Sequence, residues 1–121
     1  MGTSSSSGST SEPPRWLVKD GSVLASLEVA GGRVAKARGL LRRDGIEGVL
    51  LLRGVRSVHT FGMRFAIDVA FCDADGTVLR VLTVPRHRVT RPVWGAACVL
   101  EAEAGSFARG GVAAGDRLEL R

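Results

Sequence analysis

The stretch SVHTFGMRFAIDVAFCDADG, residues 57–76, decides how the rest of the chain is interpreted. Its odd-numbered positions from 59 to 71 are His59, Phe61, Met63, Phe65, Ile67, Val69 and Phe71. Six of these seven are large and apolar, and alternate residues of a strand share a face, so we predict that this face packs in the core with His59 at its rim. Gly62 is a natural break, which predicts two strands, near residues 58–61 and 67–72, with an irregular link over residues 62–66.

The stretch closes on the sequence DADG, which is typical of a hairpin turn. Asp73 and Asp75 can accept hydrogen bonds from nearby backbone, and Gly76 can take the position that needs a positive φ. Two acids at this spacing also occur in calcium loops, but the late bidentate glutamate of such a loop is missing. The turn interpretation is therefore preferred.

Asp68 is the polar residue inside this apolar strand. A carboxylate buried without partners costs free energy, so Asp68 needs donors. One hypothesis is structural: Asp68 anchors the link over residues 62–66 through backbone N–H groups, or pairs with Arg56 or Arg64. The other is functional: His59, Arg64 and Asp68 line one pocket.

The remaining sequence predicts mostly strands. Alternation and turn signals place strands at Trp16–Lys19, Ser22–Val29, and residues 48–52, 77–84, 96–104 and 117–120. An apolar stripe at helical spacing predicts a helix within residues 31–45, and a second short helix is expected at residues 106–109. About seven strands with two short helices indicate an α+β domain, mostly antiparallel and barrel-like.

Composition bounds the class of protein. The chain has 121 residues, of which 45% are hydrophobic and 5% aromatic, which suits one domain with an aliphatic core. Residues 1–14 are rich in Ser, Gly and Pro and are expected to be a disordered tail before a single domain at 15–121. Cys72 and Cys98 lack the spacing of a zinc site or disulfide framework, so we interpret them as small buried hydrophobes in a reducing compartment.

Several absences complete these expectations. No apolar run is long enough to span a bilayer, and the first residues lack the apolar core of a signal peptide. We therefore expect a monomer in the cytoplasm, with no cofactor, no metal site and no membrane span.

Four segments of the chain, in order, resemble the domain of unknown function 192 family. They are AKARGLLRR, GVLLL, VHTFGMRFAIDVAFCDADGTVLRV and AACVLEAEAGSFARGGVAAGDRLEL, within residues 16–120. The positions that match the family pattern are Arg38, Gly39, Leu40, His59, Phe61, Met63, Asp68, Gly76, Gly115 and Asp116. Gly62 stands where the family often has Trp, and Phe65-Ala66 replaces a more polar stretch. The family has no established activity, so the resemblance implies a fold and the location of a site.

Three functions are compatible with the sequence. The preferred one is a non-catalytic binding or accessory module for a small polar or anionic ligand, or for a protein partner. The candidate ligand-binding residues are Arg56, His59, Phe61, Met63, Arg64, Asp68, Arg86, His87, Arg88 and Trp94. Arginines favour anion contacts and Trp94 supplies an aromatic wall.

The other two functions are an enzyme and a nucleic-acid binder. An enzyme would use His59 and Asp68 as an acid–base pair, but the chain has no nucleophile elbow, metal-ligand set or phosphate loop, so no catalytic residue is assigned. The net charge of +5 is compatible with nucleic-acid binding. That function is not favoured, because the sequence lacks a recognition-helix pattern, an aromatic stacking series or a module signature, and its Arg excess is also explained by genome composition.

Overall fold

The computed structural model describes residues 13–29 and 48–121. The helix predicted within residues 31–45 lies outside the described residues, as do residues 1–12 of the predicted tail. All statements below concern the described part of the chain.

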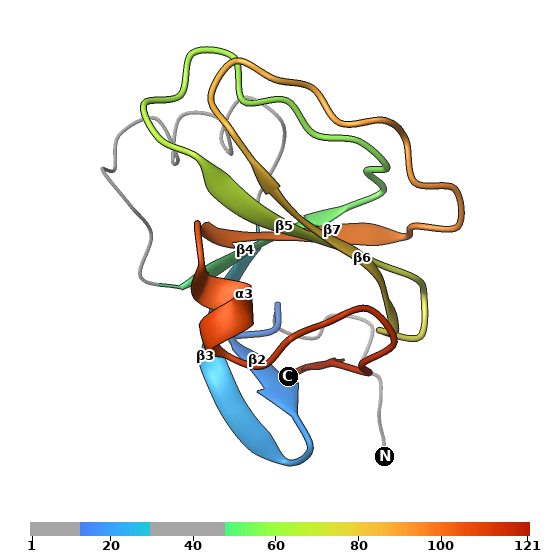
Figure 1. Ribbon diagram of the computed structural model, residues 1–121. Coiled ribbons are helices and arrows are strands. Elements are labelled where there is room, and N and C mark those ends of the chain that lie inside the picture. Colours follow the sequence, from blue (N-terminus) through green and yellow to red (C-terminus); the bar gives the residue numbers. More distant parts are fainter. Residues whose placement is uncertain (1–12, 30–47) are drawn as a thin grey trace.

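Seven strands and one short helix make up the described part of the chain (Figure 1). They are β2 (Trp16–Lys19), β3 (Ser22–Val29), β4 (Val49–Arg53), β5 (Ile67–Cys72), β6 (Val78–Val84), β7 (Cys98–Glu103), α3 (Ser106–Arg109) and β8 (Glu119–Leu120). The strands form one sheet in the order β6-β5-β7-β4-β3-β2-β8. Five of its six pairings are antiparallel and β3–β4 is parallel, so the prediction of a mostly antiparallel sheet is confirmed.

The sheet is not closed, so the barrel-like detail of the prediction is not confirmed. β6 and β8 stand at its two ends, and β8 has only two residues, both paired with β2. Turn residues nevertheless connect the two ends: the Val78 N–H donates to the Asp116 carbonyl over 2.8 Å, and the Leu118 N–H to the Gly76 carbonyl over 2.9 Å. The short segment before β8 therefore lies beside the start of β6.

β5 is the central element of the core. All six of its residues are buried, on both faces of the sheet. Ile67, Val69 and Phe71 are completely buried, as the alternation predicted, but Asp68 is only 3% exposed as well. Both faces are covered because the irregular segments around β5 lie on one side of it and α3 lies on the other (Figure 1).

The predicted strand at residues 58–61 is wrong, because only His59 makes a strand-like bridge, with Val89. Gly62 has a φ of 80°, which turns the chain and ends the pleat that residues 57–71 would otherwise share. Phe61 is consequently 56% exposed, so its assignment to the core is also wrong.

The predicted hairpin turn between β5 and β6 is confirmed. The Asp73 carboxylate accepts hydrogen bonds from the N–H groups of Asp75, at 2.9 Å, and Thr77, at 3.0 Å. Gly76 takes the left-handed conformation with a φ of 88°. The Asp73 carboxylate is thus used for local backbone bonds, as the sequence indicated, whereas Asp75 takes part through its backbone N–H.

The two ends of the described chain lie side by side. The N–H groups of Arg15 and Trp16 donate to the Arg121 carbonyl over 2.6 and 2.8 Å, and the Arg121 N–H donates to the Trp16 carbonyl over 2.9 Å. These bonds extend the pairing of β2 with β8 by one residue.

We expect Gly76→Ala to lower the free energy of unfolding by more than about 2 kcal/mol, because two costs combine. A Cβ at Gly76 would collide with the Leu118 carbonyl oxygen, and an L residue at positive φ costs about 1–2 kcal/mol by itself. Gly115→Ala is the matched control, since Gly115 also has a positive φ, of 95°, but open space around its Cβ position. Urea denaturation measures both variants, and equal losses would contradict the close approach at Leu118.

Candidate functional site

Two irregular segments, residues 54–66 between β4 and β5 and residues 85–97 between β6 and β7, lie together over one side of the sheet (Figure 1). We call them the loop pair. Backbone N–H groups of the second segment donate to carbonyls of the first: Thr90 to Val58 over 2.8 Å, and Val93 to Arg56 over 2.9 Å. The segments therefore run antiparallel, and residues about thirty positions apart in sequence become neighbours.

Thr60 joins the two segments of the loop pair from within. Its side chain is completely buried, and its hydroxyl donates to the Pro85 carbonyl over 2.5 Å and accepts from the Arg88 N–H over 3.0 Å. Its own backbone N–H donates to the Arg88 carbonyl over 2.8 Å. A buried hydroxyl needs such partners. The sequence analysis missed Thr60, because its partners lie 25 or more residues away and no local pattern announces them.

Exposed aromatic side chains lie on the loop pair. The rings of His59 and Phe61 are stacked, with centroids 5.6 Å apart and an interplanar angle of 28°. The Arg56 guanidinium lies 5.6 Å from the ring centroid of Trp94, a cation–π contact, and Trp94 is 74% exposed. These exposed rings lie on the same two segments as several arginine side chains, and this combination makes the loop pair a candidate binding surface.

The loop pair is strongly basic. Among its residues are five arginines, two histidines and no Asp or Glu, all seven of the basic ones exposed: Arg56, His59, Arg64, Arg86, His87, Arg88 and Arg91. Five arginines without an acid carry as much charge as the whole chain, whose formal net charge is +5. Within the described residues, these two segments therefore carry positive charge with no acidic side chain of their own to offset it.

Asp68 lies apart from the loop pair and bonds to other elements. One carboxylate oxygen accepts from the Thr83 hydroxyl on β6 over 2.7 Å. The other accepts from the N–H groups of Gly105, over 2.9 Å, and Phe107, over 3.1 Å, at the start of α3. The first N–H groups of a helix have no partner within it, and the Asp68 carboxylate supplies one. Asp68 therefore fixes α3 to the sheet.

These contacts change the two hypotheses about Asp68. Asp68 does accept hydrogen bonds from backbone N–H groups, as the structural hypothesis expected. The segment that it anchors is residues 105–107, however, and not the link over 62–66. His59 stacks on Phe61, and no hydrogen bond or ion pair described for residues 13–29 and 48–121 joins it to Asp68. The sequence could not identify the real partners, because residues 105–107 follow Asp68 by 37 or more positions.

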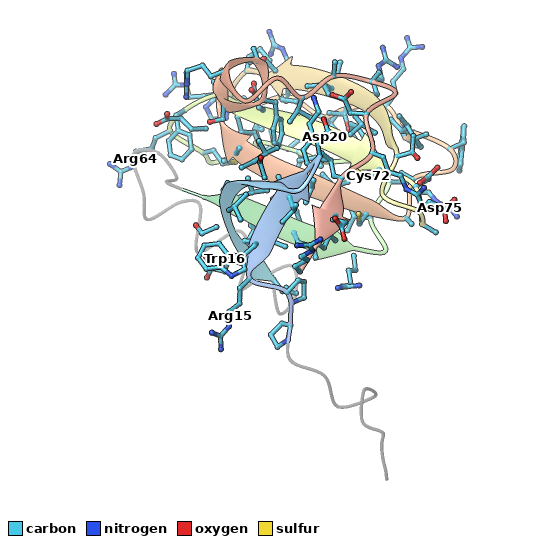
Figure 2. The ribbon with its side chains drawn as sticks, turned by 90° about the horizontal axis from the view of Figure 1, so that it is seen from below. Arg15, Trp16, Asp20, Arg64, Cys72 and Asp75 are labelled. Atoms are coloured by element: carbon cyan, nitrogen blue, oxygen red, sulfur yellow. The ribbon has the colours of Figure 1, made fainter. Side chains whose placement is uncertain are left out.

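The other predicted site residues divide between core and surface. Met63 is 7% exposed and belongs to the core cluster under the loop pair, so its side chain is not presented to a ligand. Arg64 is exposed and extends from the margin of the molecule (Figure 2). Arg86, His87 and Arg88 follow one another on the surface, where His87 has a φ of 59°, a conformation uncommon for a residue other than glycine.

Within residues 13–29 and 48–121, no group of three or more His, Cys, Asp or Glu residues is placed to hold a metal ion. The helices of that same part of the chain include none with the length and apolar character needed to cross a membrane.

Residues 16–120 match the model of a family described as “Uncharacterized ACR” and designated DUF192. The chain belongs to the DUF192 family. This confirms the resemblance noted from the sequence. In this DUF192 domain, three of the matching positions have distinct places: Phe61 on the exposed loop pair, Asp68 under α3, and Gly76 in the turn before β6. No curated protein matched the chain.

Two solved structures resemble this DUF192 domain. A protein of Sinorhizobium meliloti, described as a “putative transcription regulator”, is 26% identical with a TM-score of 0.69, over 88% of this chain and 92% of that one. A protein of unknown function from Novosphingobium aromaticivorans is 18% identical with a TM-score of 0.70, over 94% and 96% of the two chains. The second likeness concerns the fold alone.

Asp68→Asn is expected to lower the free energy of unfolding by about 1–3 kcal/mol, because the amide cannot accept from the Thr83 hydroxyl and from both N–H groups of α3 at once. His59→Ala is the comparison, with an expected loss below about 0.5 kcal/mol, since His59 is on the surface. Chemical denaturation of both variants measures the difference. An Asp68→Asn protein as stable as the parent would show that the carboxylate does not hold α3.

Proposed function

We propose that this domain is a non-catalytic binding module that takes an anionic ligand on the loop pair. The observation that carries the proposal is the gathering of five arginines, two histidines and no acid on two segments that backbone bonds hold together. An exposed surface with a single sign of charge attracts anions over several ångströms. Guanidinium groups also bind carboxylates and phosphates through paired hydrogen bonds.

The rigidity of the loop pair supports this function. Thr60 and the backbone bonds at Val58 and Arg88 fix the two segments before any ligand arrives. A surface that is ordered in advance loses less entropy on binding. The exposed faces of Phe61 and Trp94 would add contacts to an apolar or planar part of the ligand.

A binding function is preferred to catalysis because of the surroundings of His59. A general base of this type is oriented by a hydrogen-bonded carboxylate or carbonyl, and the loop pair holds no acidic residue. Asp68, the acid of the alternative hypothesis, already accepts three hydrogen bonds and is 3% exposed.

Single-stranded nucleic acid is the second candidate ligand. Aromatic rings that alternate with arginines are typical of surfaces on which bases stack while the backbone phosphates are neutralised. Phe61, His59 and Trp94 lie among the arginines of the loop pair in this way. The description of the Sinorhizobium meliloti relative as a “putative transcription regulator” is in keeping with this ligand class.

Trp94 offers a direct test, because the chain has only two tryptophans. In a Trp16→Phe background, Trp94 is the only tryptophan, and its fluorescence is expected to change on titration with tripolyphosphate or with a short thymidine oligonucleotide. The double variant Arg56→Gln/Arg88→Gln should bind at least about 10-fold more weakly. The slope of its log binding constant against log salt concentration should also be smaller, by up to about two released ions.

The control removes the same charge elsewhere. Arg80→Gln/Arg117→Gln also loses two arginines, from β6 and from the segment before β8, outside the loop pair. Equal weakening in both double variants would show that only net charge matters and would overturn the proposed surface. Binding of the oligonucleotide without tripolyphosphate would favour stacking on the aromatic rings over phosphate contacts alone.

A further inference from the structure

The two cysteines, which the sequence left unrelated, face each other across the sheet. Cys72 at the end of β5 is directly opposite Cys98 at the start of β7, and Cys98 is directly opposite Arg53 on β4. Opposed residues of an antiparallel pair have Cα atoms about 4.5–5.5 Å apart. A disulfide spans Cα separations of about 4.4–6.8 Å, so the backbone need not move for these two cysteines to be joined. Both are free thiols.

The two thiols have different surroundings. Cys72 is 2% exposed and lies among the strands, toward the hairpin that carries Asp75 (Figure 2). Its thiol donates to the Cys98 sulfur, and this bond together with burial raises the pKa of Cys72 far above that of an ordinary thiol. Cys98 is partly exposed, as the start of a strand entered from the loop pair.

Cys98 is the thiol that ionises first. Its pKa is lowered chiefly because its sulfur accepts the hydrogen bond from Cys72, and the positive charge of Arg53 acts in the same direction. Burial and the negative charge of Asp73 oppose the shift but do not reverse it. Thiolate character beside an arginine, at a partly exposed position, is the environment of reactive cysteines, whereas a fully buried thiol is inert.

We propose that Cys98 and Cys72 form a redox-active dithiol, in which Cys98 attacks a small disulfide and Cys72 resolves the product. The reaction goes beyond the proposed binding function and does not depend on it. The Arg53 guanidinium beside Cys98 favours an oxidant that carries carboxylates, such as an acidic peptide disulfide.

The exchange proceeds in two balanced steps. The Cys98 thiolate attacks one sulfur of the external disulfide, whose S–S bond breaks and releases one thiolate, leaving a mixed disulfide on Cys98. Cys72 then loses its proton to solvent and attacks the Cys98 sulfur, which expels the second thiolate. Two protein thiols lose two electrons in total, and the external disulfide gains them as two thiols.

Closing this bond would restrain half of the binding surface. The loop between the two cysteines, residues 73–97, contains β6 and the second segment of the loop pair, with Arg86 to Trp94. A cross-link limits the conformations of the unfolded chain, so the oxidised protein is expected to melt at least about 5 °C higher.

The test uses oxidised glutathione on the folded full chain, with mass spectrometry and peptide mapping. The parent protein should lose both thiols and yield the Cys72–Cys98 disulfide without retained glutathione. Cys72→Ala should stop with one glutathione on Cys98, and Cys98→Ser should remain unmodified while folded. The rate for Cys72→Ala should rise with pH at a midpoint above that of the parent's first step, because this variant lacks the Cys72 hydrogen bond that chiefly lowers the pKa of Cys98.

The variant Arg53→Gln tests whether Arg53 activates Cys98, or whether the two cysteines react only because they are close together. In the Cys72→Ala background it should slow the modification of Cys98 several-fold and raise the pH midpoint, whereas Arg80→Gln, on a strand that does not adjoin β7, should change neither. The proposal is overturned if the parent stops at the mixed disulfide, if Cys72 reacts in folded Cys98→Ser, or if Arg53→Gln and Arg80→Gln behave alike.

Discussion

The complete burial of β5 is the constraint from which most of this structure follows. A strand hidden on both faces needs a cover on each side, and the chain provides two different ones. On one side the loop pair lies over it, and on the other α3 is held down by Asp68. The Asp68 carboxylate inside β5 therefore has a structural role. It accepts a hydrogen bond from the Thr83 hydroxyl of β6 and two from backbone N–H groups at the start of α3. The loop pair can cover the sheet without forming strands, because a covering segment does not need the regular hydrogen bonds of a strand.

The fold was predictable where its signals are local. Alternating residues and turn sequences placed β2, β3 and β5 at their exact limits, and DADG identified the turn before β6. The prediction failed where the alternating sequence pattern extended beyond the strand that it described, which begins only at Ile67. Phe61 has the parity of the core residues, but the positive φ of Gly62 separates it from them. Closure of the sheet was also not predictable, because it depends on how few residues pair at β8.

The candidate site was predictable in composition and not in geometry. Arginines and aromatic residues near His59 and near Trp94 were both noted from the sequence, and the structure places these two segments side by side. The link between them is Thr60, whose role depends on carbonyl and N–H groups 25 and 28 residues away. Asp68 was singled out for the correct reason, its burial cost, but its distant donors assign it to the scaffold. Pairings of this kind need the sheet register, which no local pattern contains.

Arg15 and Arg121 are hydrogen-bonded neighbours, so the folded domain connects to any flanking chain at one place on its surface. Residues 15 and 121 could therefore be joined by a short linker, and the chain opened elsewhere, with little change in the contacts of the domain. The Asp20–Gly21 turn is a suitable new opening, since it is exposed and lies between β2 and β3. Circular permutants cut there should keep the loop pair intact, because both of its segments lie between other strands, β4 and β5 and β6 and β7. The same adjacency suits residues 15–121 to insertion into a surface loop of another protein, because such an insert would separate the two sides of that loop only slightly.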